Sequence, residues 1–156
     1  MKAKDLMIPL SECAQVAEDR SLQDTMILLS AFRQRYSRSD YPPRFVLVAD
    51  DRYRIVGVLR HLEILRALGK AAGPGGPSLS KMVAAAPRVA ARDAMTRYSA
   101  AEQIRADAPT EEAIERMLHD AFRHMLVVEA GATIGIPRLS EMFARARKEL
   151  AHAAQD

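Results

Sequence analysis

The sequence predicts an α+β fold with α/β-type small sheets, in which the order β-α-β-β-α occurs twice. Three observations support this prediction. A Gly- and Pro-rich stretch over residues 69–78 divides the 156 residues into two comparable lengths. A four-residue motif near the N-terminus recurs 88 positions further on. Within each half, one helical pattern of apolar residues precedes two short runs rich in β-branched residues, which is typical of a helix followed by two strands.

The repeated motif opens each half. Lys4-Asp5-Leu6-Met7 recurs as Arg92-Asp93-Ala94-Met95, and Glu18-Asp19 is matched at the same offset by Ala106-Asp107. A short strand is expected just before each of these acidic positions, over residues 15–17 and 103–105.

A helix follows the short strand in each half. Ser21 and Thr110 are the expected N-caps, because a side-chain oxygen at that position accepts a hydrogen bond from a free amide of the first turn. The apolar residues behind them recur three and four positions apart, as one buried helix face requires. These faces consist of Leu22, Met26 and Leu29 in the first half and Ala113, Ile114, Met117 and Leu118 in the second.

Two strands and a second helix complete each half. Apolar runs that are too short for helices predict buried strands over residues 45–48 and 125–128. After a turn, the second strands are expected over residues 54–58 and 133–136, and the second helices over residues 61–68 and 140–150.

The domain boundaries follow from the repeat. The first half covers residues 1–69 and holds a polar insertion over residues 33–44, and a linker covers residues 70–80. The second half covers residues 81–150, followed by a tail over residues 151–156. Because a unit of this size buries little apolar surface by itself, the two halves are expected to share one core.

The composition excludes several classes of protein. The chain is 49% hydrophobic and 28% charged, values that are ordinary for globular proteins, and it has no apolar run of the ~18–20 residues that span a bilayer. The N-terminal residues do not form a secretory signal, and the single Cys13 fits a reducing compartment, so a cytoplasmic protein is expected. A net charge of +3 and the absence of tryptophan disfavour nucleic-acid binding.

In this order, the motifs resemble a tandem pair of CBS (cystathionine β-synthase) domains, also called a Bateman module. The resemblance covers residues 2–69 and 81–150 and rests on the Asp-x-Met openings and on the strand-turn-strand segments that contain Gly57 and Gly135. It implies two units packed by their sheets with pseudo-twofold symmetry, with clefts between them. In many members a cleft binds AMP, ADP, ATP or S-adenosylmethionine. It also implies a regulatory module without catalytic activity, a homodimer, and an output through a separate regulated protein.

The family's nucleotide signature places a Ser or Thr and, three residues later, an Asp at the start of the second helix. In this chain the hydroxyl position holds Arg60 in one half and Arg138 in the other, and the aspartate position holds Glu63 and Glu141. Two interpretations stay open. The glutamates accept ribose hydroxyls while the arginines pair with phosphate, or each arginine pairs with its own glutamate as an i,i+3 ion pair worth ~0.2–0.5 kcal/mol.

Further candidate ligand-binding residues follow from the resemblance. Thr96 matches the hydroxyl residue that often follows the methionine and lines the cleft, whereas its counterpart is Ile8. Thr96 therefore favours the cleft that it lines, unless it only bonds to nearby backbone. The strands that begin at Phe45 and Met125 are expected to flank an adenine ring, and Arg44 abuts the first of them; a purely structural role for these side chains is the alternative.

Other patterns indicate no further chemistry. Tyr36 and Tyr41 among the arginines of the 33–44 insertion favour a solvated loop or a dimer contact over a nucleic-acid site. His119 and His124 are five residues apart, which does not align them on a helix, so no metal site is expected. No nucleophile or dinucleotide motif is present, and no enzyme is expected. The leading hypothesis is a stand-alone module that senses an adenine nucleotide. The alternative is a ligand-free structural module that acts through dimerisation or a partner protein.

Overall fold

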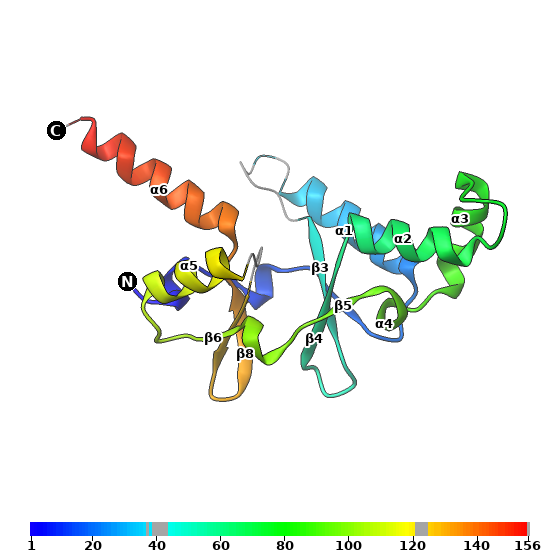
Figure 1. The fold of residues 1–156 in the computed structure, drawn as a ribbon, viewed down its shortest axis with the longest axis horizontal. Helices are drawn as coiled ribbons and strands as arrows, with labels where there is room; N and C mark the ends of the chain where they lie inside the picture. The colour runs from blue at the N-terminus through cyan, green and yellow to red at the C-terminus, as the bar shows by residue number, and fades with distance from the viewer. Residues whose placement is uncertain (37, 39–43, 121–124, 156) are drawn as a thin grey trace. The chain divides into compact units, whose positions relative to one another are not determined.

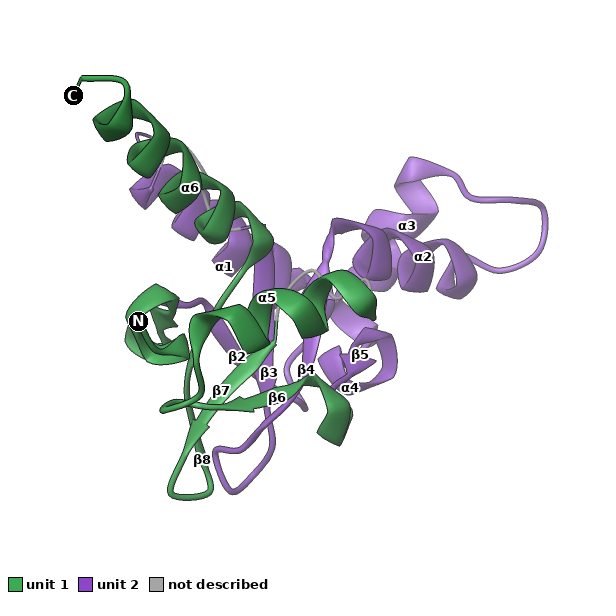
Figure 2. Ribbon diagram, turned by 60° about the vertical axis from the view of Figure 1, so that its left-hand side comes forward, with its two compact units in different colours: residues 1–12, 99–156 green, residues 13–98 purple. Residues whose placement is uncertain are grey.

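The computed structural model describes residues 1–36, 38, 44–120 and 125–155 (Figure 1). The chain forms two compact units (Figure 2). Unit 1 combines residues 1–12 with residues 99–156, and unit 2 consists of residues 13–98. Each unit contains a four-stranded sheet. The predicted α+β fold with small sheets is therefore confirmed.

Unit 2 is built around the sheet β2-β3-β4-β5. Strand β2 runs parallel to β3, and the other neighbours are antiparallel. Helices α2 and α3 pack against each other (Figure 1). The elements of the unit are β2 (Gln15–Ala17), α1 (Leu22–Arg35), β3 (Phe45–Ala49), β4 (Ile55–Arg60), α2 (His61–Ala71), α3 (Leu79–Ala85), a short 3-10 helix (Ala86–Arg88), α4 (Ala91–Ala94) and β5 (Thr96–Arg97).

Unit 1 has the same topology, with the sheet order β1-β8-β7-β6. Strand β6 runs parallel to β7, and β8 is antiparallel to both β7 and β1. Helix α6 projects from this sheet and buries none of its described residues (Figure 2). The elements are three 3-10 helices (Ala3–Leu6, Leu10–Glu12 and Ala100–Glu102), β1 (Ile8–Pro9), β6 (Gln103–Arg105), α5 (Thr110–His119), β7 (Leu126–Glu129), β8 (Ala132–Ile136) and α6 (Leu139–Ala153).

The compact units differ from the two halves of the sequence repeat. The opening segment of each half joins the sheet of the other half: Pro9 pairs with Gly135, and Arg97 pairs with Gly57. The division into residues 1–69 and 81–150 therefore describes the repeat, whereas the packing units exchange their N-terminal segments.

The repeated Met and Gly residues explain this exchange. A Cβ at Gly57 would lie 2.5 Å from the sulfur of Met95, and a Cβ at Gly135 would lie 2.5 Å from the sulfur of Met7. Only a residue without a side chain lets the exchanged segment approach this closely. The methionine of each Asp-x-Met opening thus packs over the glycine of the other half.

Each unit has its own apolar core. In unit 2, Val46, Val48 and Leu59 of the central strands are fully buried against Leu22 and the rest of α1. The equivalent cluster in unit 1 contains Ala113, Met117, Met125 and Val127. The strands predicted from the apolar runs thus supply much of each core. Apolar residues follow one another along such a strand because packed elements cover both of its faces.

Most expected elements are confirmed, including the short strands over residues 15–17 and 103–105. Ser21 caps α1, since its side-chain oxygen accepts a bond of 3.1 Å from the amide of Asp24. Thr110 is not an N-cap: Pro109 takes that position and Thr110 is the first residue of α5.

Three further expectations need correction. The linker is shorter than residues 70–80, because α2 ends at Ala71 and α3 begins after its cap Ser78, whose oxygen accepts from the amide of Lys81 at 3.3 Å. Met26 and Leu118 are 41% and 68% exposed, so they do not belong to the buried faces of their helices. In the 33–44 insertion, residues 33–35 belong to α1, and residues 37 and 39–43 lie outside the described residues.

Candidate functional site

The eight candidate ligand-binding residues fall into two groups, one in each compact unit. The Glu63 group, in unit 2, consists of Arg44, Phe45, Arg60, Glu63 and Thr96, and the Glu141 group, in unit 1, consists of Met125, Arg138 and Glu141. Both groups lie where the last strand of a sheet hairpin passes into the following helix, β4 into α2 and β8 into α6.

The Glu63 group is organised by a capping box at the start of α2. Arg60 is the N-cap, and Glu63 is the third residue of the helix. The Glu63 carboxylate turns back on Arg60: Oε2 accepts from the Arg60 amide at 3.0 Å, and Oε1 accepts from Nε at 2.9 Å and also from Nη2. The glutamate thus satisfies a backbone amide that the helix leaves without a partner and pairs with a cation as well.

Thr96 adds a contact from a distant part of the chain. Its hydroxyl donates a bond of 3.1 Å to Oε1 of Glu63. The contact forms because β5 pairs with β4 and places Thr96 opposite Val58, two residues before Arg60. The sequence predicted that Thr96 either lines a cleft or bonds to nearby backbone. It did not predict the bond to Glu63, a side chain of the first half.

The electrostatics of the Glu63 group favour an ionised carboxylate. The Glu63 side chain is 10% exposed, whereas that of Arg60 is 30% exposed. Burial acts to raise the pKa of Glu63, but the hydrogen bonds and positive charge of Arg60, together with backbone amides, outweigh it and hold the pKa below its ordinary value. Glu63 therefore carries a full negative charge that Arg60 balances.

Phe45 and Arg44 lie at the start of the neighbouring strand. Phe45 is paired opposite Arg60 in the sheet and is 4% exposed, so its side chain belongs to the core. Arg44 precedes it and is exposed. The first residue of β3 is thus paired with Arg60 in the sheet, while the Phe45 side chain packs in the core.

The Glu141 group has a similar pair with fewer contacts. Arg138 is the N-cap of α6, and its Nη2 donates to Oε1 of Glu141 at 2.8 Å. The Arg138 side chain is 11% exposed and the Glu141 side chain is 33% exposed. In this group the glutamate is therefore the more exposed partner, whereas in the Glu63 group the arginine is. Met125 is fully buried, and its amide donates to the carbonyl of Pro137 at 3.3 Å, next to Arg138.

The ion pairs that the sequence left open as one interpretation are therefore present in both units. They differ in the residue at the position of Thr96. In unit 1 that position is Ile8, paired opposite Ile136 just as Thr96 is paired opposite Val58. The isoleucine side chain has no hydrogen-bond donor, so the bond from Thr96 to Glu63 has no equivalent at Glu141.

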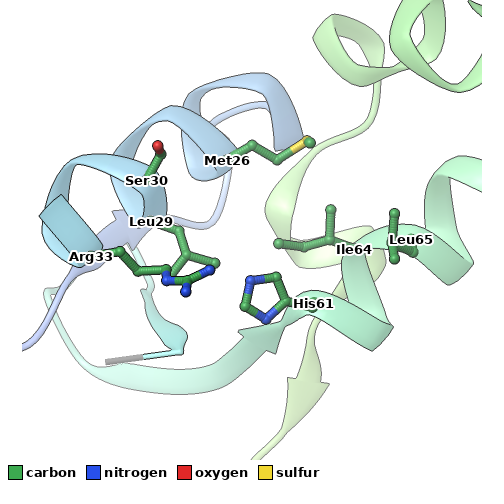
Figure 3. A pocket seen from close by; sticks show the side chains of 7 residues that line it. All are labelled: Met26, Leu29, Ser30, Arg33, His61, Ile64 and Leu65. Atoms are coloured by element: carbon green, nitrogen blue, oxygen red, sulfur yellow. The ribbon is translucent and has the colours of Figure 1, made fainter. Parts of the chain in front are cut away.

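A separate pocket of about 200 Å³ lies between α1 and the first turns of α2 (Figure 3). The side chains of Arg33 and His61 point toward one another at one end, and the remainder of the lining is apolar apart from Ser30 (Figure 3). The sequence analysis missed this pocket, although Met26, Ser30 and Arg33 recur at helical spacing and mark a mixed stripe on α1. The complete lining is Met26, Leu29, Ser30, Arg33, His61, Ile64 and Leu65.

Two other candidate sites have local explanations. The Tyr36 ring packs on Phe32, with ring centroids 6.0 Å apart, and the Arg35 guanidinium lies 5.7 Å from its centre. Tyr41 lies outside the described residues. His119 bonds to Asp120 at 3.0 Å, which raises the pKa of this exposed histidine, and its suggested partner His124 lies outside the described residues. In the described part of the chain, no three His, Cys, Asp or Glu residues gather into a metal site.

Solved structures with this topology identify the fold. CBSX2, described as a CBS-pair protein from Arabidopsis thaliana, in complex with AMP, is 24% identical with a TM-score of 0.69, and the match covers 94% of this chain and 97% of that one. A CBS-domain containing protein from Agrobacterium tumefaciens is 22% identical with a TM-score of 0.63, over 92% of this chain and 91% of that one. The chain has the fold of a tandem pair of CBS domains.

A third CBS-pair neighbour belongs to a larger protein. The cytosolic domain of the Mg²⁺ channel MgtE, in complex with ATP, is 22% identical with a TM-score of 0.61, over 92% of this chain and 48% of that one. No family model and no curated protein sequence matches the chain. Among the helices that the structure describes, none is long and apolar enough to cross a membrane.

Proposed function

We propose that this CBS pair is a regulatory module that binds an adenine nucleotide, AMP, ADP, ATP or S-adenosylmethionine, through an Arg–Glu pair at a junction of strand and helix. One observation carries the proposal: the same Arg-x-x-Glu pair is built twice at the junction of strand and helix, in a fold of which two solved examples contain AMP and ATP. The two candidate pairs are Arg60 with Glu63 and Arg138 with Glu141.

The chemistry of the pairs suits a nucleotide. A glutamate carboxylate accepts hydrogen bonds from the two hydroxyls of a ribose. An arginine guanidinium donates two parallel bonds to a phosphate, which favours a phosphorylated nucleoside over the nucleoside alone. The strand starts at Phe45 and Met125 lie next to the pairs and flank the base in this proposal. Binding of this kind needs no catalytic group. In this proposal the module signals through a separate regulated protein in the cytoplasm.

A thermal-shift and calorimetry series tests the proposal. AMP, ADP, ATP and S-adenosylmethionine are added to the full chain at up to millimolar concentration, with adenosine and GMP as controls. At least one of the four is expected to raise the melting temperature, because a ligand that binds only the folded state stabilises it by mass action. If none of the four shifts the melting temperature or releases heat, the nucleotide proposal is wrong.

A second candidate function is a ligand-free interaction module that acts as a homodimer. It is favoured by an apolar groove between α1, α2 and α3 of unit 2, where Ile27, Leu79 and Val83 are 62%, 77% and 63% exposed. Exposed apolar patches of this kind mark protein interaction sites. Light scattering with and without AMP tests this candidate. It predicts a dimer whose mass does not change when AMP is added, and the double substitution Ile27→Glu and Val83→Glu is expected to dissociate that dimer. A monomer at all concentrations would exclude it.

A further inference from the structure

The two Arg–Glu pairs differ in how much of each carboxylate is already in use. Glu63 accepts four bonds from its own chain: from the amide, Nε and Nη2 of Arg60, and from the hydroxyl of Thr96. Among the described residues, Glu141 accepts one, from Nη2 of Arg138. We infer that the Glu63 group is closed by its own chain and that Glu141 alone is available to ribose hydroxyls. This inference rests on the proposed function.

A carboxylate can accept only a limited number of hydrogen bonds. An ionised carboxylate offers about four acceptor positions on its two oxygens. Glu63 receives four internal donors, three on Oε1 and one on Oε2, which leaves at most one position, on Oε2. A ribose that brings both hydroxyls to Glu63 has to displace the Thr96 hydroxyl or an Arg60 donor, and a displaced donor in a half-buried place costs most of what the new bond contributes. Binding there has little net gain.

Glu141 is in the opposite state. Its side chain is 33% exposed, compared with 10% for Glu63, and Oε2 takes no bond from the described residues. The amide of Arg138 does not occupy it either, since α6 lacks the capping box that α2 has. Two ribose hydroxyls can therefore bond to Glu141 while its ion pair with Arg138 stays in place.

One residue type accounts for much of the difference. Thr96 and Ile8 occupy matching register positions on the edge strands, opposite Val58 and Ile136. The threonine donates to the carboxylate in its unit, and the isoleucine has no donor. Thr96 thus supplies one of the four donors at Glu63, beside the three of Arg60, and in this inference it does not mark the competent site as its place in the sequence suggested.

Calorimetric titration of the full chain with AMP tests this inference. The wild type is expected to bind one AMP per chain. Glu141→Gln keeps the size of the side chain but loses its charge, and it is expected to weaken binding at least about tenfold, the effect of losing a hydrogen bond to a charged group. Glu63→Gln is the matched control, with affinity and stoichiometry unchanged. Circular dichroism and melting curves without ligand verify that both variants fold.

Two exchanges at the edge strands test the role of the hydroxyl independently. Ile8→Thr places a donor beside Glu141 and is expected to weaken AMP binding about three- to tenfold. Thr96→Val is expected to leave affinity and stoichiometry unchanged, because Arg60 still occupies Glu63. Binding lost in Glu63→Gln and kept in Glu141→Gln, or two AMP per wild-type chain, would overturn this inference and leave the proposed function intact. No AMP binding by the wild type would overturn both for this nucleotide.

Discussion

The hydroxyl of Thr96 donates a hydrogen bond of 3.1 Å to the carboxylate of Glu63, across 33 residues of sequence. This bond joins the opening segment of the second half to the last helix of the first half. It forms within unit 2, because β5 pairs with β4 rather than with the strands of its own half. The exchange of segments between the halves thus determines which side chains surround each glutamate.

Removal of the Thr96 hydroxyl is expected to destabilise unit 2. Thr96→Val keeps the shape of the side chain and leaves one acceptor position of Glu63 unfilled, which costs about 1 kcal/mol in a half-buried place. Urea unfolding measures the free energy. Thr96→Ser retains the hydroxyl and is expected to keep most of the stability; equal losses in the two variants would contradict a role for the bond.

Alanine is expected to disrupt both sheet glycines. Besides the two methionine sulfurs, the new Cβ would meet the Thr96 carbonyl oxygen at 2.9 Å in Gly57→Ala and the Ile8 carbonyl oxygen at 2.6 Å in Gly135→Ala. Because backbone atoms cannot move aside as a flexible side chain does, each change is expected to cost about 1–3 kcal/mol, measured by thermal or urea unfolding.

Gly69→Ala is the matched control for these substitutions. Gly69 lies in α2, and the nearest atom to an added Cβ is 3.9 Å away, in Pro77. Alanine is expected to be neutral or to stabilise the helix by up to about 1 kcal/mol. If Gly57→Ala behaves like Gly69→Ala, the close approach of Met95 to the sheet does not exist in solution.

The stability of unit 2 is expected to depend on pH through Glu63. Its pKa in the folded chain lies below the ordinary value of 4.5, because Arg60 and backbone donors outweigh the effect of burial. The unfolded chain therefore binds a proton at higher pH than the folded chain. The stabilisation is present above about pH 4.5 and is lost as the pH falls through the lower folded value.

Urea unfolding between pH 6 and pH 3 measures this effect in the wild type and in Glu63→Gln. The stability advantage of the wild type is expected to shrink on acidification, since glutamine does not titrate. A difference that stays constant over this range would show that the ionised Glu63 carboxylate does not contribute to folding.

Loss of the N-cap of α1 is expected to weaken the same unit. Ser21→Ala removes the oxygen that accepts from the Asp24 amide, at an expected cost of about 1 kcal/mol in unfolding free energy. Ser30→Ala, an exposed position within α1, is the control and is expected to change stability little or to increase it slightly. Equal effects of the two changes would argue against the cap.

Much of the candidate site was predicted from local spacing. Arg60 with Glu63 and Arg138 with Glu141 form the i,i+3 pairs that the sequence suggested, because three residues at the start of a helix bring the two side chains to one face. The partner of Thr96 could not be predicted, since no local pattern specifies which strand lies beside it. The pocket beside Arg33 and His61 was missed because its lining residues come from two helices. The sequence of neither helix specifies the angle at which the two helices pack.

The sequence by itself determined the repeat, the order of the elements and the apolar strands, because the periodicity of side chains along the chain is a local property. Only the tertiary structure decided that residues 1–12 join unit 1 and residues 86–97 join unit 2. That choice depends on contacts between distant segments, such as Met95 over Gly57 and Met7 over Gly135. The energies of these contacts depend on the shape and volume of the side chains where they meet. The spacing of hydrophobic residues along the sequence does not specify them.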